Sequence, residues 1–453
     1  MRSKRFLITF LTAVVIIAGT LVAIQFAKGY RPGQKGILQG TGLLAANSFP
    51  NGAQVYLNGK LTTATDNTLN LEPGTYDIQI KKDGYVTWEK SLRIENELVT
   101  QTNAVLFPSA PSLTPLTFTG ASNLSVSPDG QKIAFYVASA SAQAKNGLYV
   151  LDLTDSMLSL QHGPRQIAQA PNTTDFAKAK LLWSPDSAQI LVSYDGHNLL
   201  LDPNRMNSVS DAQDITYQLP TVFSQWEEDL YKRERTRLAK FPDAIQYIAT
   251  ASAKNVYFSP DDYRILYTAT ASAHLADTLV PPVPSSNTQV QERTLQAGGT
   301  YVYDRYEDRN FRVGSEILPS PVPGIKSSTP ALIQQLLAND LFTTPRTLAA
   351  SPSAFKLLQG KTPAETIANF QLHYSNIYTG NLQWYPDSKH LIGIKDTAII
   401  LKEYDGTNES TIFAGSLVDN FIYPWPNGSK LIILTNFHQS LTAPVNLYAI
   451  TLK

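Results

Sequence analysis

The stretch Asn123–Ser139, NLSVSPDGQKIAFYVAS, consists of two apolar runs separated by the turn residues Ser127-Pro128-Asp129-Gly130. Before the turn, apolar and polar residues alternate, as in a strand with one buried face; Ile133–Val137, after the turn, is continuously apolar. Proline presets φ for the second position of a β-turn, and aspartate accepts hydrogen bonds from nearby backbone amides. The stretch therefore predicts two antiparallel strands, the second buried on both faces.

The same arrangement returns at Ser184, Ser259, Tyr385 and Trp425. Apolar residues stand one and three positions before each turn, and six and seven positions after it. A third strand-like run follows each pair, starting at Leu148, Asn198, Thr300, Ala398 and Asn446. The residues that we assign to the repeated turns are Pro128, Asp129, Pro185, Asp186, Pro260, Asp261, Pro386, Asp387, Pro426 and Asn427.

Each repeat is predicted to be an antiparallel meander that cannot bury both of its faces alone. Radial stacking of such meanders gives a β-propeller. Five blades are marked; a sixth is either unmarked, or the segment PLTFTG from Pro115 completes the last blade. The turns are 57, 75, 126 and 40 residues apart, so insertions must interrupt the ring.

This pattern resembles the WD40-like PD40 repeat of the TolB-type propellers. The resemblance rests on SVSPDGQKIAF, LWSPDSAQILV, YFSPDDYRILY and QWYPDSKHLIG, with PWPNGSKLIIL as a divergent fifth copy, and covers residues 113–453. It implies a propeller with loops around a central opening, which suits recognition of proteins, peptides or glycans. Repeated aspartates could also ligate a metal, but equivalent turns of different blades lie apart, so we expect a purely structural role and no cofactor.

Residues 41–107 predict a small β-sandwich, because short alternating runs are separated by Asn-Gly, Pro-Gly and Asp-Gly turns. The segments PNGA at Pro50, VYLNG at Val55, LEPGTYDIQI at Leu71 and GYVTW at Gly84 resemble the PEGA domain family. Asn51 stands where that motif has glutamate. The resemblance implies a surface β module without catalytic residues.

The first 40 residues predict a membrane anchor and a linker. Phe6–Ala27 is an uncharged run of 22 residues, long enough to span a bilayer as a helix. Residues 1–5 would form a cytoplasmic tail and 28–40 a linker, with the bulk of the chain extracytoplasmic. A cleaved signal peptide is the alternative. Basic residues flank the run on both sides, so the positive-inside count alone hardly orients it.

The net charge is 0 because a basic N-terminal segment offsets an excess of acidic residues in the rest of the chain. Without the six basic residues of the first 35 positions, 31 basic and 37 acidic residues remain. An acidic body of about −6 is a poor match for nucleic acid, which needs clustered lysine and arginine. The chain has no cysteine, which excludes disulfides and thiolate metal sites.

Two helical insertions are predicted in the propeller, at about 221–242 and 326–371. In the first, Ser224 and Glu227 have capping-box spacing and Pro242 would end the helix. Its basic run, Lys232–Arg237, is interpreted as a solvated face of a helix that packs on the propeller. The second has Thr-Pro or Ser-Pro pairs at Thr329, Ser351 and Thr362. It is our first candidate for partner specificity, whereas VPPVPSSN from Val280 predicts a long exposed loop.

No catalytic grouping is visible. The chain has no nucleophile elbow and no P-loop, and its six histidines are scattered. DRYEDRN at Asp304 lacks the glycine and the final glutamate of a calcium loop and predicts a charged hairpin. We therefore expect a membrane-anchored binding or scaffold protein of the cell envelope that is not an enzyme. The alternative is a propeller-fold hydrolase or lyase with its site in the central channel.

Overall fold

A computed structural model describes residues 2–27, 30–32, 38–154, 163–170, 176–281, 283–284, 287–315, 362–367, 382–437 and 444–453. The chain forms two compact units, Met1–Ala110 with Pro281–Gln291, and Pro111–Val280 with Glu292–Lys453. The predicted helix starts at Thr329 and Ser351 lie outside the described residues, as do three of the six histidines.

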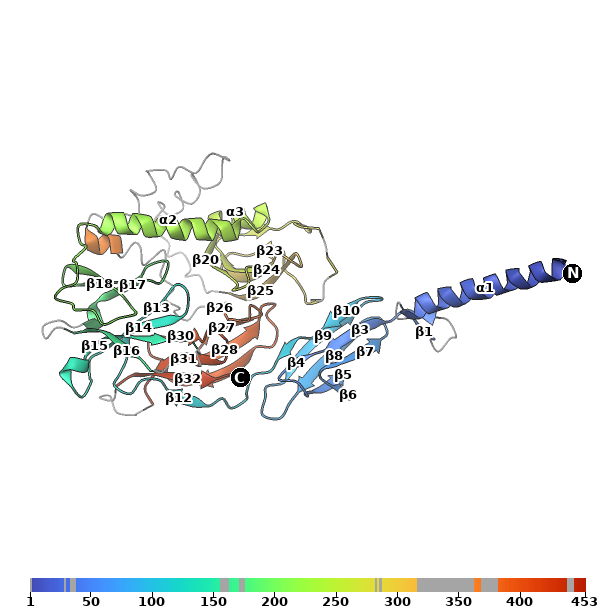
Figure 1. Cartoon of the computed structure of the whole chain (residues 1–453), viewed down its shortest axis with the longest axis horizontal. Coiled ribbons are helices and arrows are strands. Elements are labelled where there is room, and N and C mark those ends of the chain that lie inside the picture. Colours follow the sequence, from blue (N-terminus) through green and yellow to red (C-terminus); the bar gives the residue numbers. More distant parts are fainter. Residues whose placement is uncertain are drawn as a thin grey trace, which may run out of the picture. The chain divides into compact units, whose positions relative to one another are not determined.

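Helix α1 (Arg2–Ala27) is continuous (Figure 1). Its segment Leu7–Phe26 is long and apolar enough to cross a membrane, with a mean hydropathy of 2.7 and no residue buried against protein. The hydroxyls of Thr12 and Thr20 donate to the carbonyls of Ile8 (2.5 Å) and Ile16 (2.8 Å), so neither polar group would need water. A signal sequence satisfies the same criteria of length and composition.

The first unit is a small β-sandwich. One sheet has the order β10-β3-β7 and the other β6-β5-β8-β9. Their strands are β3 (Gly42–Ala46), β5 (Gln54–Leu57), β6 (Lys60–Ala64), β7 (Asn67–Leu71), β8 (Gly74–Lys81), β9 (Trp88–Ile94) and β10 (Val99–Gln101). Short pairs join β1 (Arg31–Pro32) to β2 (Leu38–Gln39) and β4 (Ser48–Phe49) to β11 (Ala104–Val105). Alternate residues such as Val55, Ile78 and Ile80 are fully buried between the sheets.

The segment Pro281–Gln291 belongs to this first unit. Pro281 is exposed, as the predicted loop requires, but Thr288 and Gln289 are held by hydrogen bonds. Thr288 Oγ1 accepts a hydrogen bond from the Arg93 amide (3.1 Å), and Gln289 Nε2 donates to the Ser91 carbonyl (2.8 Å). Both bonds go to β9, an edge strand of its sheet, so they satisfy backbone groups that would otherwise need water.

The described part of the second unit has five antiparallel meanders, which we call blades 1 to 5, in the order of the five repeats. Blade 1 comprises β13 (Ser122–Val126), β14 (Lys132–Val137), β15 (Gly147–Asp152) and β16 (Arg165–Gln169), and blade 2 comprises β17 (Lys180–Trp183), β18 (Ile190–Tyr194) and β19 (His197–Leu201). Blade 3 comprises β20 (Ala253–Phe258), β21 (Arg264–Ala269), β24 (Gly299–Asp304) and β25 (Arg309–Ser315), with a small extension of β22 (Ala273–His274) and β23 (Thr294–Leu295). Blade 4 comprises β26 (Gln383–Trp384), β27 (His390–Lys395), β28 (Ala398–Glu403) and β29 (Ser410–Ala414). Blade 5 comprises β30 (Ile422–Pro424), β31 (Lys430–Thr435), β32 (Asn446–Thr451) and β12 (Leu113–Pro115).

The apolar second strand of each repeat forms the centre of its blade, as predicted. Ile133, Ile190, Ile265, Leu391 and Leu431 are all fully buried. Side chains of successive blades form shared cores between blades 1 and 2, 3 and 4, and 5 and 1. The all-β fold is therefore a small sandwich followed by a propeller, and the third strand of each repeat lies where the sequence predicts it.

Blade 5 is completed by a strand from the start of the unit. Leu113, Thr114 and Pro115 pair with Ile450, Ala449 and Tyr448, so β12 is the outer strand of the last blade. Thr117 Oγ1 also hydrogen-bonds Asn446 Oδ1 (3.0 Å). Of the two possibilities left open by the sequence, the segment around Pro115 thus closes the fifth blade.

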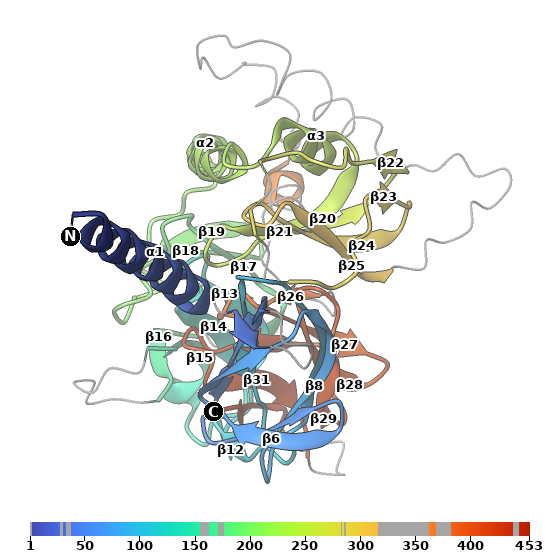
Figure 2. The same cartoon turned by 90° about the vertical axis from the view of Figure 1, so that its right-hand side faces the viewer.

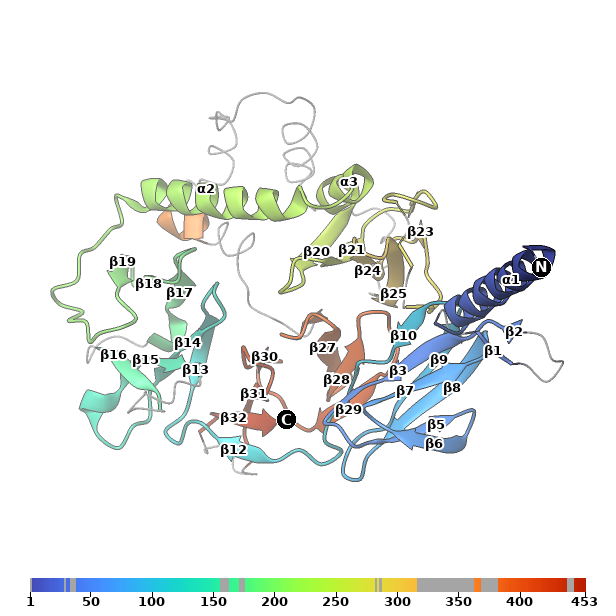
Figure 3. The same cartoon turned by 45° about the vertical axis from the view of Figure 1, so that its right-hand side comes forward.

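Helices α2 (Leu219–Leu238) and α3 (Asp243–Ala251) lie between blade 2 and blade 3 (Figure 3). One face of α2 packs on blade 2, and the end of α2 joins α3 on blade 3. Helix α3 lies beside β20 (Figure 2). The buried residues at the junction with blade 2 are Leu182, Leu191, Ile215, Leu219, Phe223, Trp226, Leu230 and Ile367. These helices therefore occupy a sixth sector of the ring that is not a β-sheet.

The predicted ends of the first insertion are wrong. The helix begins at Leu219 and not at Ser224, which lies inside it, and it ends at Leu238. Burial of Leu219 and Phe223 against blade 2 extends the helix toward its start, and Pro242 caps α3, which the sequence did not reveal. In the second insertion, residues 363–367 are helical. The capping box predicted there is confirmed, with Thr362 N donating to Glu365 Oε2 (3.1 Å) and Glu365 N to Thr362 Oγ1 (3.2 Å).

Candidate functional site: the turns around the channel

The five repeat turns share one hydrogen-bond pattern. In each, the amide of the fourth residue donates to the carbonyl of the first, at 2.7–3.1 Å. The side-chain oxygen of the third residue then accepts from the amide two positions later, as from Asp129 to Gln131 (3.0 Å). The equivalent acceptors are Asp186 (3.0 Å), Asp261 (3.0 Å), Asp387 (2.8 Å) and Asn427 (2.8 Å). All four aspartates and the asparagine are thus engaged with their own turns.

The fourth residue of every turn has a positive φ. The values are 71° at Gly130, 60° at Ser187, 61° at Asp262, 60° at Ser388 and 67° at Gly428. In each turn, this same residue also makes a hydrogen bond to a neighbouring sector. The fourth residue is consequently the point at which one turn contacts the next.

Four junctions between adjacent blades use these contacts. The Asp129 amide donates to Ser187 Oγ, and the Asp261 amide donates to Ser388 Oγ, each at 3.1 Å. The phenol of Tyr385 donates to the Gly428 carbonyl. Tyr423 Oη donates to the Gly130 carbonyl (3.2 Å) and so joins blade 5 to blade 1.

Between blades 2 and 3, helix α2 links the two repeat turns in place of a direct contact between them. Arg233 Nη1 donates to the Pro185 carbonyl of blade 2 (3.3 Å). Arg237 donates to Asp262 Oδ1 (2.6 Å) and to the Ser259 carbonyl (3.2 Å) of blade 3, and its guanidinium lies 4.7 Å from the centre of the Phe258 ring. The repeat turns are therefore linked all the way around the ring. In the sixth sector, Arg233 and Arg237, which are one helical turn apart, make the links.

Asp262 is the acidic centre of this junction. Lys240 Nζ also donates to it (2.8 Å), so one carboxylate holds two basic side chains. Burial raises the pKa of Asp262, but the hydrogen bonds and positive charges of Lys240 and Arg237 outweigh burial and hold the pKa below its usual range. The basic run that we interpreted as a solvated face thus contains two residues that bind the turns, and spacing alone carried no signal of this.

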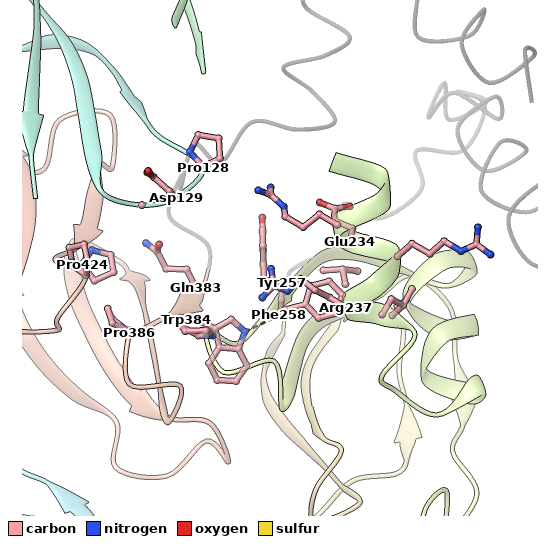
Figure 4. Close-up of a pocket in the computed structure, with 18 of the residues that line it drawn as sticks. Pro128, Asp129, Glu234, Arg237, Tyr257, Phe258, Gln383, Trp384, Pro386 and Pro424 are labelled. Atoms are coloured by element: carbon pink, nitrogen blue, oxygen red, sulfur yellow. Dashed lines mark hydrogen bonds between the residues drawn. The ribbon is translucent and has the colours of Figure 1, made fainter. Parts of the chain in front are cut away.

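The turns surround a cavity of about 820 Å³. Figure 4 shows Pro128 and Asp129 on one side and α2 on the other, with Tyr257, Gln383 and Trp384 between them. Pro260, Pro386 and Pro426 of the predicted turn residues also line it, whereas Pro185 is not among the lining residues. The aromatic rings in the lining are those of Tyr231, Tyr257, Phe258, Trp384 and Tyr423. The structure therefore brings four of the five turns predicted from the sequence to one channel mouth.

The acidic and basic side chains of the lining are Asp129, Arg233, Glu234, Arg235 and Arg237. Glu234 lies on α2, across the cavity from Asp129 (Figure 4). Glu234 is exposed as a residue, but the protein around its carboxyl displaces water and raises the pKa of that group, and the positive charges of Arg233 and Arg237 oppose the rise. Neither a histidine nor a third carboxylate is among the lining residues that the structure describes, and no metal-binding group of three acidic or histidine residues occurs in those parts of the chain.

The two aspartates of the DRYEDRN segment contact basic side chains inside the fold and do not line the cavity. Asp304 and Asp308, from DRYEDRN, are buried at the β24–β25 hairpin. Arg264 Nε lies 2.7 Å from Asp304 Oδ2, and Arg293 Nη2 lies 3.2 Å from Asp308 Oδ2. The hairpin is charged, as predicted, and its two buried aspartates are paired with arginines inside blade 3.

Residues 41–109 match the model of the PEGA domain, the family that the sequence of this segment resembles. No curated protein matches the chain. Among solved structures, TolB from Acinetobacter baumannii is 11% identical over 83% of this chain and 59% of that chain, with a TM-score of 0.20. Oligogalacturonate lyase from Vibrio parahaemolyticus is 9% identical over 83% of this chain and 74% of that chain, also with a TM-score of 0.20. Because these TM-scores are low, we assign the propeller fold from the order of the strands in the five blades.

Proposed function

We propose that this chain is a membrane-anchored, extracytoplasmic binding or scaffold protein of the cell envelope. In this proposal, α1 holds the chain at the membrane and the PEGA domain is a spacer or surface contact. The propeller binds its partner at the channel mouth formed by the turns and α2. We expect the partner to be a protein, peptide or glycan of the envelope, and the channel mouth favours a polypeptide segment.

The cavity is the observation that carries this proposal. About 820 Å³ is in the range of ligand sites, and its wall mixes proline and aromatic rings with a few polar and charged groups. Such a wall offers apolar contact area together with groups that fix orientation, which suits an extended polypeptide. Because the turns are hydrogen-bonded to one another, the mouth is preorganised, which lowers the entropy cost of binding.

The alternative, a hydrolase or lyase with its site in the channel, has less support. Acid–base chemistry would need titratable groups close together, and the described lining offers only Asp129 and Glu234 as carboxylates, from opposite sides of the cavity (Figure 4). We therefore retain binding as the proposed activity.

Photo-crosslinking in intact cells tests the proposal. A photoreactive amino acid replaces Gln131, which lines the cavity, in the full chain. The matched control places it at Lys145, an exposed residue of the short helix Gln143–Lys145 on blade 1 that is not part of the lining. We expect a defined cross-linked polypeptide from position 131 and none from position 145. Equal products from both positions, or none from position 131, would contradict the proposal.

A further inference from the structure

The third strand of blade 4 carries a charged residue at a position that is apolar or aromatic in the other four blades. Lys402 of β28 pairs with Leu391. The residues that pair with the equivalents of Leu391 in the other blades are Leu151, Leu201, Tyr303 and Ile450. All four are buried, and so is Lys402, with 9% of its side chain exposed. Burying an ammonium group costs free energy unless negative charge compensates it, so the packing of the repeat does not explain this lysine.

The surroundings of Lys402 supply only part of the negative charge that its ammonium group needs. Lys402 Nζ donates to the Val313 carbonyl of β25 (2.5 Å) and lies 3.4 Å from Glu409 Oε2. The other carboxylate oxygen of Glu409 accepts from Lys395 Nζ (2.6 Å), so two ammonium groups share one carboxylate. Lys402 Nζ has no further partner among the residues that the structure describes. Burial lowers the pKa of Lys402, and Lys395 lowers it further, although Glu409 opposes both effects.

Lys402 lines a cavity of about 480 Å³ between blades 3 and 4, within the range of sites for small molecules. The cavity shares no lining residue with the cavity at the repeat turns. Lys395, Lys402 and Glu409 are the acidic and basic residues of its described lining, which leaves an excess of positive charge. The apolar side chains of the lining are Leu266, Val313, Leu382, Ile394 and Ile400. A buried cation beside apolar walls suits an anion with an apolar body better than a strongly hydrated inorganic anion.

We propose that this cavity is a second binding site, which takes a small carboxylate with an apolar body, such as an arylacetate. The carboxylate accepts a charge-assisted hydrogen bond from Lys402 Nζ and supplies the negative charge that Glu409 has to divide between two lysines. The apolar body packs against Ile394 and Ile400 of blade 4 and Leu266 of blade 3. This site is separate from the channel mouth and does not depend on the partner proposed there.

The probe is 4-fluorophenylacetate, added to the full chain in a non-ionic detergent and followed by fluorine NMR line broadening. Its neutral isostere, 4-fluorophenylacetamide, is the control for apolar contact and for uptake by micelles. We expect the carboxylate to bind about tenfold more tightly than the amide, the effect of one charge-assisted hydrogen bond. Unlabelled phenylacetate should displace the probe at about a tenth of the concentration that acetate requires, because acetate lacks the apolar body.

Lys402→Met keeps an unbranched apolar stem and removes the charge, so it should abolish the preference for the carboxylate. Thermal unfolding should show a fold at least as stable as the wild type, because the other blades have uncharged residues at this position. The matched control is Lys389→Met, which removes an exposed lysine of the same blade outside the lining and should change nothing.

Equal binding of the carboxylate and the amide to the wild-type chain would overturn the inference, and so would a preference that persists in Lys402→Met. Displacement by acetate as effective as that by phenylacetate would show that any carboxylate suffices, an acidic side chain included, and would overturn the assignment of an apolar ligand. These comparisons on the wild-type chain decide the proposal even where Lys402→Met does not fold.

Discussion

Tyr423 Oη donates a hydrogen bond to the carbonyl of Gly130 (3.2 Å), and this bond joins the last blade to the first across 293 residues of sequence. Gly130 has a φ of 71°, and a Cβ added there would lie 2.6 Å from Tyr423 Oη. The glycine is therefore required twice, by the left-handed turn and by the close approach of the phenol.

Gly130→Ala is expected to lower the free energy of unfolding by about 2–3 kcal/mol, through an unfavourable φ and a clash. Gly196→Ala is the matched control, because Gly196 also has a positive φ (84°) but nothing lies within 4 Å of its added Cβ. That variant should lose only about 1 kcal/mol. Urea unfolding of the two variants checks the difference; equal losses would show that Tyr423 does not constrain the turn.

Asp186→Asn should be nearly silent. Asp186 Oδ1 accepts from Ser184 Oγ (2.5 Å) and the Ala188 amide (3.0 Å), and an asparagine oxygen can accept the same bonds. Asp186→Val should lower the free energy of unfolding by about 1–2 kcal/mol, because it removes both bonds and places a β-branched residue in a turn. Elemental analysis provides the second readout, since a metal lost from the Asn variant would contradict the structural role that we propose.

The ion pairs at Asp262 should make the stability of the fold decrease at low pH. Its pKa is lowered in the folded state, so its contribution is present above the unfolded value, about 3.9, and is lost as the pH falls through the folded value. Asp262→Asn should therefore cost about 1–2 kcal/mol at pH 7 and much less at pH 3. Unfolding of both proteins at the two pH values measures this, and a constant difference would rule the ion pairs out as its source.

Glu227 should make stability depend on pH in the opposite direction, which the same unfolding experiment can measure. Burial raises its pKa to about 7, so the folded state favours the neutral carboxyl, and stability is lost as the pH rises from about 4.5 through 7. Glu227→Gln should stabilise the chain at pH 8 by about 1–2 kcal/mol, discounted for partial exposure, and have little effect at pH 4. A variant no more stable than the wild type at pH 8 would contradict the burial of this carboxyl.

Replacing residues 326–361 by a short Gly-Ser linker should leave the propeller folded and abolish partner binding. Extending the replacement to residue 371 should also destabilise the fold, because Ile367 is buried against α2 and blade 2. The cost should be about 2–4 kcal/mol, as for deletion of other buried isoleucines. Thermal unfolding and the Gln131 cross-link separate the two effects.

The same linker in place of residues 281–286 is the control and should be tolerated. If the cross-linked partner persists without residues 326–361, this insertion does not carry the partner specificity that its sequence leads us to expect.

Protease added to spheroplasts should digest the body of the chain while the inner membrane stays sealed. The reason is the apolar segment Leu7–Phe26, with the short basic tail retained inside. Immunoblotting for the C-terminal region measures the digestion, and a cytoplasmic marker protein shows that the membrane is intact. Full protection of the body would reverse the orientation.

Local pattern was enough to predict the strands of the propeller, because a period of two and a recurring Pro-Asp turn are properties of neighbouring residues. Ile133 and its four equivalents are buried, and the third strands follow in order, without knowledge of any contact between blades. The capping box at Thr362 and Glu365 was predictable for the same reason, since its two bonds join residues three apart.

The tertiary structure alone decided how the ring closes and what faces the channel. Arg233 and Arg237 appear in the sequence as part of an ordinary basic helix, and their partners Pro185 and Asp262 lie 48 and 25 residues away. The start of α2 at Leu219 depends on burial against blade 2, which overrides the local capping signal at Ser224. Each of these features arises where segments distant in the chain meet, and the free energy of such contacts leaves no periodicity in the sequence. The strands of each blade could therefore be predicted from its own repeat. The helical sixth sector and the environment of Glu234, by contrast, form only when the ring is assembled.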